Sequence, residues 1–594
     1  MLSPAQYYTE QKERYALLLA KTIKEFNRIA MLRLWSAVGA IAAIIWAFRG
    51  GESWHWWFAA IIIAVFLLLV RMHTRLSENK ELLQLHLTLI DNEQLAMQGN
   101  ISAFADGAAY TEVAHPYSYD LDIFGKGSIY QSLCRTVTVG GASLLAGRLA
   151  RLTLNKEMIT ARQEIVKELS LQPELLQNFR VAGASIEEGP RDQQNLIQWL
   201  QEKDLFINNG FIRITAVVMP VLSGACIAWS IFIGTVYPAL YIVIMVNWLL
   251  LGLFQKKIKL AARQLGNTAK FIDKYESLMK HTASSEFTNG WLQQVKANAA
   301  KSLENISSFK KIVHLFESRS NTMTGPIMNT FFLFDFYCLL KLEHWRRDHK
   351  SALITAIGDV IEMDVYVSCG GYAFNHPENI YARITTGSEI AATDLRHPLL
   401  HAATAVGNDV SLGASEQFYL LTGANMTGKS TFIRTIGVTN ILTNIGLPLP
   451  AKELSMPLLD LYTSMRITDS VQDDISYFRA ELNRIRAMMD KVSNSKQPYL
   501  ILLDEPLRGT NSTDKQQGTR AIIETLITYN AVGIIATHDT GLCDMEATHK
   551  GKISNYYFES KVAQGELTFD FRIRRGGSTS NNATILMRQM GIIK

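Results

Sequence analysis

A ten-residue segment, Thr422–Thr431 (TGANMTGKST), constrains the fold most strongly, because its pattern requires a strand before it and a helix after it. The pattern is G-x-x-x-x-G-K-S, whose glycines let backbone N–H groups surround phosphate oxygens. The apolar residues Phe418–Leu421 predict a short strand before the segment, and Phe432–Ile445 predict a helix after it. The partial positive charge of the helix N-terminus favours phosphate at this position. The sequence therefore predicts a phosphate-binding loop within an α/β domain.

The residues of this segment predict individual contacts with a nucleoside triphosphate. Lys429 is expected to reach the β- and γ-phosphates, and the Ser430 hydroxyl to bind Mg²⁺. Asn425 is expected to shape the loop through side-chain hydrogen bonds, whereas Met426 is expected to pack. The residues predicted to contact the nucleotide form the loop and the first helical turn: Gly423, Ala424, Asn425, Met426, Thr427, Gly428, Lys429, Ser430 and Thr431.

Two further apolar segments are followed by side chains suited to hydrolysis. Tyr499–Leu503 predicts a buried parallel strand and precedes Asp504 and Glu505. Asp504 is expected to hold the Mg²⁺ shell, and Glu505 to orient or deprotonate the attacking water. Val532–Ala536 predicts another strand, after which His538 is placed to sense the γ-phosphate. In this order after a phosphate-binding loop, the segments predict an ATP hydrolase with ATP and Mg²⁺ as cofactors.

Four runs of the sequence resemble the MutS family of ATPases. They are the phosphate-binding run GANMTGKSTFIR, the signature run Asp473–Phe478 followed by Glu481, the Walker B and D-loop run Leu502–Asp514, and the histidine-switch run Ala536–Asp539. The signature run is shortened before Ser476, and Pro506 stands where the family has an apolar residue. In that family two ATPase domains enclose ATP, which implies a homodimer whose Ser476 completes the site of the other subunit. The resemblance implies catalytic roles for Glu505, His538, Lys429 and Ser476, and metal ligation by Ser430 and Asp504.

The helical part of the chain resembles the same family more loosely. Residues 133–163 resemble the start of the family's helical core, with its T-x-T-x-x-G-x-R-x-L pattern, and depart from it at Ala142. Asp359–Pro377 resembles the helix that returns from the lever, and Arg396–Pro398 resembles the start of the ATPase domain. The mismatch-reading domain of bacterial MutS carries a Phe-x-Glu wedge. Neither this wedge nor a connector domain is found before the helical core, so the resemblance does not extend to mismatch reading.

Four apolar runs, paired as two hairpins, predict helices that cross a membrane. The runs are residues 34–48 and 54–70, then 214–232 and 237–254. Each is near the minimum length that crosses a hydrocarbon core of about 30 Å, and Trp54, Trp56 and Trp57 lie where an interfacial aromatic belt is expected. The alternative is that these runs are buried core helices of a large soluble protein. A shorter stretch, Phe331–Leu340, contains Asp335 and is expected to pack in the core or at the interface.

Basic residues flank both hairpins away from their turns. They are Lys12, Arg14, Lys21, Lys24, Arg28, Arg33, Arg71, Arg75, Lys80, Arg213, Lys256, Lys257, Lys259 and Arg263. Because positively charged segments stay in the cytoplasm, both turns are predicted to face outward from the inner (plasma) membrane. Both termini and the ATPase domain are then cytoplasmic. Membrane lipid is an expected partner, and it accounts for much of the net charge of +5 without a nucleic-acid footprint.

These segments divide the 594 residues into four predicted parts. We expect a basic helix, a membrane hairpin and a stalk over 1–110, a helical core with the second hairpin over 111–385, the ATPase domain over 386–570 and a dimer-contact segment over 571–594. The predicted fold class is therefore multidomain, with transmembrane helical hairpins, an all-α MutS-like core and lever, and an α/β P-loop ATPase domain of the ABC type. The five cysteines contain no C-x-x-C pair, which suits a reducing cytosol.

Three functions remain open from the sequence. The first is an ATPase clamp that binds double-stranded DNA near the membrane, which the family resemblance favours. The second is a membrane scaffold or remodelling ATPase without DNA, which the hairpin inserted in the helical core favours. The third is an ABC-type transport ATPase, which the lack of an LSGGQ run disfavours. The lysines of Lys256–Ser320 are interleaved with Glu276, Glu286 and Glu304, and suit a solvated helix face slightly better than a DNA contact.

Overall fold

The computed structural model describes residues 3–50, 52–204, 206–236, 238–318, 324–401, 403–424, 426–466, 477–563 and 566–577. The chain divides into two compact units that interleave along the sequence. The first, here called the helical unit, contains Met1–Gln94, Thr136–Gly141 and Glu174–Asp364. The second, here called the sheet unit, contains Leu95–Arg135, Ala142–Pro173 and Val365–Lys594.

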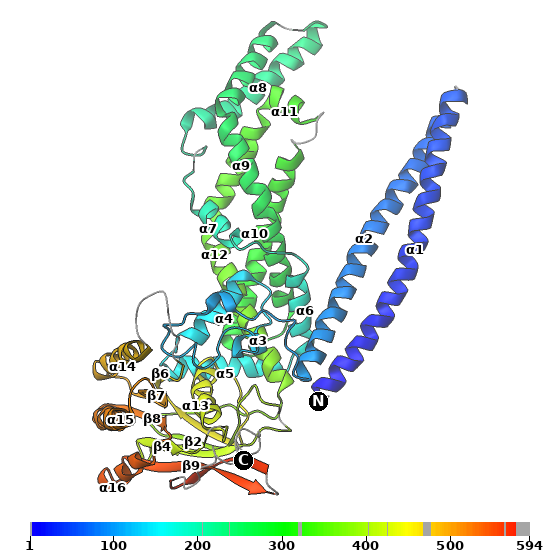
Figure 1. Ribbon diagram of the computed structural model, residues 1–594. Coiled ribbons are helices and arrows are strands. Elements are labelled where there is room, and N and C mark those ends of the chain that lie inside the picture. The colour runs from blue at the N-terminus through cyan, green and yellow to red at the C-terminus, as the bar shows by residue number, and fades with distance from the viewer. Residues whose placement is uncertain are drawn as a thin grey trace. The chain divides into compact units, whose positions relative to one another are not determined.

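The helical unit is built around α9. Its helices are α1 (Pro4–Gly50), α2 (Ser53–Met97), α6 (Pro173–Ala184), α7 (Asp192–Gln201), α8 (Gly210–Ile233), α9 (Pro238–Ser284), α10 (Gly290–Ser318), α11 (Thr324–Phe332) and the first part of α12 (Phe334–Asn375). Helix α9 packs along α10 and contacts α7, α8 and α11 (Figure 1). The predicted lever region is thus a set of long helices.

Within the described part of this unit, four helices are long and apolar enough to cross a membrane: α1, α2, α8 and the Pro238–Ala261 part of α9. The first three predicted apolar runs fall within α1, α2 and α8, and residues 238–254 of the fourth fall within α9. Helices α1 and α2 extend well beyond the predicted runs, because helical hydrogen bonding continues through their polar halves. Many apolar side chains on these helices are exposed, including Trp57 and Phe232. The helical character and apolar surface of the predicted hairpins are therefore confirmed.

The base of the α1–α2 hairpin is fixed to α6 by polar contacts. A buried ion pair joins Glu93 of α2 to Arg180 of α6 at 2.6 Å. On the same helix, Gln177 accepts a hydrogen bond from the Tyr7 hydroxyl at 3.3 Å and lies 3.2 Å from the His86 ring nitrogen. Burial lowers the pKa of His86 to about 4, so the ring is neutral at physiological pH. Because a buried charge without its partner is costly, the Glu93–Arg180 pair specifies how the hairpin base sits on α6.

The run that resembles the family's core pattern folds around one buried carboxylate, Asp364 of α12. Asp364 accepts hydrogen bonds from the backbone N–H groups of Val137 and Thr138 and, at 2.6 Å, from the Thr138 hydroxyl. A Cβ at Gly141 would lie 2.3 Å from this carboxylate, which explains the glycine. Burial raises the pKa of Asp364 to about 6. The threonine and glycine of the pattern therefore serve packing around Asp364.

The sheet unit contains two β-sheets, one with the strand order β10–β9–β4–β8–β7–β6 and one with the order β1–β5–β2–β3. The strands are β1 (Arg383–Thr385), β2 (Ile390–Leu395), β3 (Asn408–Leu412), β4 (Phe418–Thr422), β5 (Glu453–Pro457), β6 (Asp460–Ser464), β7 (Tyr499–Asp504), β8 (Ala531–Ala536), β9 (Ile553–Ala563) and β10 (Glu566–Arg575). In the larger sheet only β10 pairs antiparallel.

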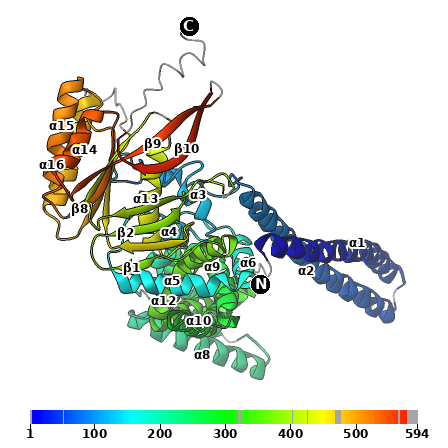
Figure 2. The same cartoon turned by 90° about the horizontal axis from the view of Figure 1, so that it is seen from below.

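Helices cover both faces of the larger sheet (Figure 2). The helices of the sheet unit are η1 (Ala108–Tyr110), α3 (Ile129–Leu133), α4 (Val139–Ala150), α5 (Lys156–Ser170), α13 (Lys429–Asn444), α14 (Tyr477–Ser493), α15 (Ser512–Leu526), η2 (Thr540–Asp544) and α16 (Met545–Thr548). Side chains of α14 and α15 share a core with one face of the strands, and Gly437 of α13 packs on Leu502 of the other face. Every residue of β4, β7 and β8 is buried, as their continuous apolar runs predict.

Candidate nucleotide site

The predicted phosphate-binding loop connects β4 to α13 at the carboxyl end of an inner strand of the larger sheet. The backbone takes positive φ at Gly423 (144°) and Gly428 (105°). A Cβ at Gly423 would lie 3.0 Å from the Phe558 carbonyl oxygen, so the close approach of β9 also favours glycine there. The Thr427 hydroxyl donates to the Ala424 carbonyl at 2.8 Å. The loop therefore has the tight backbone that its glycines predict.

Lys429 is the first residue of α13 and is buried in the loop. Its ammonium group donates to the carbonyl oxygens of Gly423 and Ala424, at 2.7 and 2.8 Å. Burial lowers the pKa of Lys429, while the carboxylates of Asp504 and Glu505 act in the opposite direction. Charged phosphate oxygens are stronger acceptors for an ammonium than neutral carbonyl oxygens. The bonds to the loop carbonyls are therefore exchangeable for bonds to phosphate.

Ser430 and Asp504 meet where α13 begins and β7 ends. The Ser430 hydroxyl donates to Asp504 Oδ2 at 2.6 Å. Asp504 is mostly buried, and an Arg508 guanidinium nitrogen lies 3.9 Å from its other oxygen. Hydroxyl and carboxylate oxygens are the hard ligands that Mg²⁺ prefers. This pair of side chains therefore fits a Mg²⁺ ion beside the phosphate-binding loop.

Glu505 follows β7 with a positive φ of 52° and lies in a cluster of positive charge. His538 Nε2 lies 2.6 Å from one Glu505 oxygen, and Arg508 Nε lies 3.4 Å from the other. The hydrogen bond with His538, reinforced by the charges of His538, Arg508 and Lys515, lowers the pKa of Glu505 to about 2. A carboxylate with so low a pKa is a weak proton acceptor. In this arrangement Glu505 is therefore ion-paired rather than poised to activate water.

A cavity of about 360 Å³ opens over these side chains. Its lining residues are Met426, Gly428, Lys429, Ser430, Thr431, Asp504, Glu505, Arg508 and Phe571. The expectation that Met426 packs is wrong, because the loop turns outward there with a φ of 68° and leaves the side chain 70% exposed. The structure thus brings the predicted lysine, the serine hydroxyl and both carboxylates to one cavity. His538 does not line the cavity but contacts Glu505, which does.

Two predicted site residues, Asn425 and Ser476, lie outside the described residues, as does most of the signature run. The run's last residue, Glu481 of α14, is described and buried. Its carboxylate accepts a hydrogen bond from the Leu507 N–H at 2.6 Å. Burial raises the pKa of Glu481, and the backbone bonds lower it. Because Leu507 has a φ of 63°, Glu481 stabilises the strained turn that follows Glu505.

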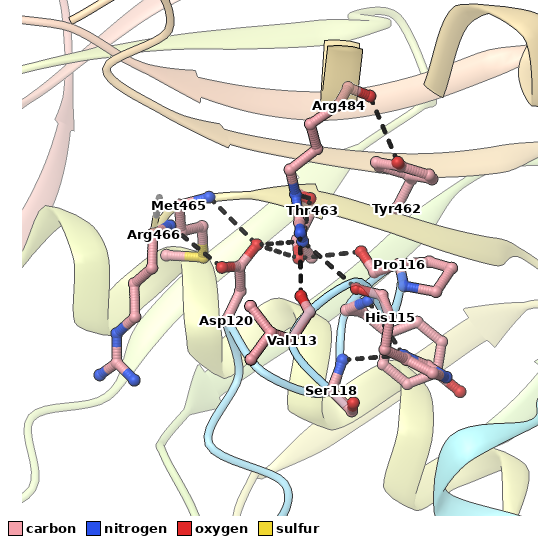
Figure 3. Close-up of polar contacts among 11 residues, drawn as sticks. Val113, His115, Pro116, Ser118, Asp120, Tyr462, Thr463, Met465, Arg466 and Arg484 are labelled. Carbon is pink, nitrogen blue, oxygen red and sulfur yellow. Dashed lines mark hydrogen bonds and ion pairs between the residues drawn. The ribbon is translucent and has the colours of Figure 1, made fainter. Parts of the chain in front are cut away.

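A buried aspartate that the sequence analysis missed organises the segment after β6. Asp120 accepts hydrogen bonds from the Thr463 hydroxyl at 2.7 Å and from the Arg484 guanidinium at 2.9 Å. It also accepts the backbone N–H groups of Met465 and Arg466 (Figure 3). With four donors directed at a fully buried carboxylate, this network fixes the path of the chain as it leaves β6.

The neighbouring Asp122 connects this network to the phosphate-binding helix. Its carboxylate pairs with Arg434 of α13 at 2.8 Å and with Arg466. The residue has a positive φ of 51°, which is uncommon outside glycine. The one sequence signal was two aspartates within the mainly apolar and aromatic run Tyr117–Phe124, because a carboxylate in such a run needs partners when it is buried.

A mainly parallel sheet, with polar side chains gathered beyond the carboxyl ends of β4, β7 and β8, places the sheet unit among α/β proteins that bind ligands at that edge. Comparison with known proteins shows which family this part of the chain is similar to. Residues 419–592 match the family model of MutS domain V. The DNA mismatch repair protein MutS of Thermus thermophilus is 29% identical over 257 residues, which cover 43% of this chain and 30% of the relative.

Two other relatives with the same name show a similar partial match. Those of Thermotoga sp. and Fervidobacterium nodosum are each 31% identical, over 205 and 224 residues. These matches cover 34% and 37% of this chain, and 25% and 26% of the relatives. The C-terminal part of the chain is therefore similar to MutS proteins, and residues 419–592 match their domain V, as its sequence runs predicted. It spans less than a third of the length of these relatives.

Proposed function

We propose that this protein is a membrane-anchored MutS-like ATPase that binds and hydrolyses ATP as a homodimer. The observation that carries the proposal is the meeting of Lys429, Ser430, Asp504 and Glu505 at one cavity, with His538 bonded to Glu505. A lysine at a helix N-terminus serves the phosphates, and the hydroxyl–carboxylate pair serves Mg²⁺. The match to MutS domain V supports the same assignment.

The proposed mechanism exchanges the contacts seen in the site. Lys429 leaves the carbonyl oxygens of Gly423 and Ala424 and binds the β- and γ-phosphates. Ser430 and Asp504 would hold Mg²⁺, which when bound would neutralise charge on the phosphates. Release of Glu505 from its hydrogen bond with His538 would raise the pKa of Glu505 and allow the carboxylate to orient or deprotonate water. His538 then senses the γ-phosphate.

The family relationship supports two further parts of the proposal. Ser476 would complete the nucleotide site of the second protomer, which makes hydrolysis depend on dimerisation. The C-terminal segment 571–594 is proposed to contribute to the dimer contact. Residues 1–110, 111–385 and 386–570 are proposed to act as membrane stalk, helical core and ATPase domain.

The four apolar helices support a multi-pass location in the inner (plasma) membrane. The basic residues at the inner ends of both predicted hairpins support an orientation with both termini and the ATPase domain in the cytoplasm. The exposed apolar side chains of α1, α2, α8 and α9 would then contact lipid. The nucleotide site would have access to cytoplasmic ATP.

We propose coupling to double-stranded DNA as the first candidate role, because the matched relatives are named DNA mismatch repair proteins. A DNA-independent scaffold or remodelling role is the alternative, and one contact set favours it. Lys280 pairs with Glu276 at 2.7 Å, and Lys310 pairs with both Asp273 and Glu276. These two lysines of the lever helices are thus already neutralised by acidic partners. An ABC-type transport role has no such support.

The test is ATP hydrolysis by the full-length protein in lipid nanodiscs, with and without duplex or branched DNA, at low and high salt. Lys429→Ala, which removes the lysine of the cavity, is expected to lose hydrolysis. Lys496→Ala is its matched control, because Lys496 is an exposed lysine outside the cavity. Stimulation by DNA that fades with salt establishes the DNA role. Hydrolysis that no DNA changes supports the DNA-independent role. Absence of ATP hydrolysis under every condition contradicts the proposed ATPase.

A further inference from the structure

We propose that α11 is a re-entrant membrane helix, inserted in the hydrocarbon layer beside α8 and α9 and clamped there by Asn247. The inference rests on the proposed membrane insertion of α8 and α9. It concerns the stretch 331–340, which was expected to pack in the core or at the interface. The structure divides this stretch at Leu333, which has a φ of 47° and separates the end of α11 from the start of α12.

The depth of α11 follows from the position of Asn247 along α9. The apolar part of α9 begins at Pro238, about nine residues before Asn247, which corresponds to roughly 14 Å at the rise of an α-helix. This distance is about half of a hydrocarbon layer that is roughly 30 Å thick. The Asn247 side chain is fully buried within the protein. Asn247 therefore presents a polar group to a protein partner near the middle of the layer.

That partner is the last turn of α11. The Asn247 amide donates to the carbonyl oxygens of Thr330, at 2.8 Å, and Phe331, at 3.5 Å. The Trp248 indole N–H donates to the Thr330 hydroxyl at 3.0 Å. Carbonyl groups in the last turn of a helix lack helical partners, and in hydrocarbon they cannot be satisfied by water. The Asn247 amide therefore supplies hydrogen-bond donors to these carbonyl oxygens near the middle of the hydrocarbon layer.

The break between α11 and α12 is satisfied internally in the same way. The Asn329 side-chain oxygen accepts the N–H of Asp335 at 2.9 Å, at the start of α12 where backbone N–H groups lack helical partners. The carbonyl of Asn329 accepts the Leu333 N–H, and the carbonyl of Leu333 accepts the Phe336 N–H. Broken helices are tolerated in a bilayer when side chains satisfy the freed backbone groups. Several of the backbone groups freed at the break therefore have protein partners, as a non-aqueous environment favours.

The outer surface of α11 is suited to lipid acyl chains. Ile327 and Met328 are exposed, and they lie within a turn of the residues that Asn247 contacts. Helix α11 packs against both α8 and α9 (Figure 1), so its apolar surface continues their exposed apolar surface. Further along the chain, the Lys341 ammonium lies 4.7 Å from the centre of the Tyr337 ring. This aromatic and basic pair is typical of a membrane interface, where α12 would leave the layer.

The test places a photo-crosslinking amino acid at position 327 in the full chain, reconstituted in phospholipid nanodiscs. Position 221, in the middle of α8, reports whether the proposed span is in lipid, and position 280 is the control outside the layer. The expected result is a mass increase of one phospholipid at positions 327 and 221 and none at 280. Asn247→Leu is expected to abolish the adduct at 327 while keeping that at 221. Ser223→Ala, at a buried hydroxyl of α8 that has no hydrogen-bond partner among the described residues, is expected to keep both adducts.

The outcomes separate this inference from the membrane proposal. No lipid adduct at position 221 contradicts the membrane insertion on which the inference rests. A lipid adduct at 221 but none at 327 overturns the re-entrant helix alone. A crosslink from 327 to a second copy of the chain also overturns it, because the surface is then covered by protein. An adduct at 327 that persists in Asn247→Leu overturns the role of Asn247 as the clamp.

Discussion

The nucleotide cavity of the sheet unit and the α8–α9–α11 cluster of the helical unit both hold polar groups in fixed places, but by different means. In the sheet unit, the carboxyl ends of parallel strands bring residues distant in sequence to one edge, as with Ser430 and Asp504. In the helical unit, Asn247 lies in the apolar part of α9 and donates to a backbone carbonyl oxygen of α11. The first arrangement can be recognised by spacing in the sequence. The second can be recognised only once the neighbouring helix is known.

The comparison predicts that substitutions in the nucleotide cavity change ATP binding, whereas substitutions in the helical unit leave ATP binding unchanged. The largest effect is expected for Lys429→Ala, which removes the cation that we place on the phosphates. We expect ATP affinity, measured by calorimetry, to fall about ten- to a hundredfold, because a hydrogen bond to a charged group contributes about 1.5–3 kcal/mol. Lys496→Ala should bind ATP normally. Unchanged affinity in Lys429→Ala would break the assignment of the cavity as the nucleotide site.

The next effect concerns the helical unit. Arg180→Ala removes the buried ion pair between Glu93 and Arg180, which is expected to destabilise the base of the α1–α2 hairpin by about 3–5 kcal/mol. Thermal unfolding and protease cleavage near the hairpin base would measure it, and ATP affinity should be unchanged. Lys12→Ala is the control, because its ion pair with Asp91 is half exposed and is worth about 1 kcal/mol or less. Equal effects of the two variants would contradict the inferred burial.

A smaller effect is expected for Asp120→Asn in the sheet unit. The amide keeps the shape but weakens the bonds to the Arg484 guanidinium and the backbone, by about 1.5–3 kcal/mol in all. Because the Asp120 network fixes the path of the chain after β6, kcat should fall. Because Asp120 does not line the cavity, the KM for ATP should be unchanged. Asp490→Asn, at an exposed aspartate of α14, should change neither. A raised KM with unchanged kcat would contradict a positioning role.

The smallest effect is a difference in pH response between the units. The pKa of Asp364 is raised to about 6 by burial, so its contribution to stability is largest below the unfolded value of 3.8 and is lost as pH rises through 6. The pKa of Glu505 is lowered to about 2, chiefly by its bond with His538, so its contribution is present above 4.5 and lost as pH falls toward 2. Unfolding midpoints of Asp364→Asn and Glu505→Gln, followed from pH 3 to 7, should therefore diverge from the parent in opposite directions. Parallel curves would show that these carboxylates do not differ in environment.

The sequence predicted the strands and the loop of the nucleotide site because glycine, lysine and continuous apolar runs have strong local requirements. It also predicted the apolar helices, though not their full length, because polarity does not end a helix. Asp120 and Asp122 were missed because their partners come from β6, α13 and α14, hundreds of residues away. The exposure of Met426 was missed because it depends on the local φ of the folded loop.

The measurement that tests the central claim most directly is a single-turnover hydrolysis assay of ATP by the full-length protein in nanodiscs. The parent protein and Glu505→Gln should both bind ATP, since Lys429 and the Ser430–Asp504 pair are intact in both. We expect the parent to convert bound ATP to ADP and phosphate, and Glu505→Gln to retain ATP unhydrolysed. Equal rates of ADP formation in the two proteins would contradict the role of Glu505 and, with it, the proposed site of hydrolysis.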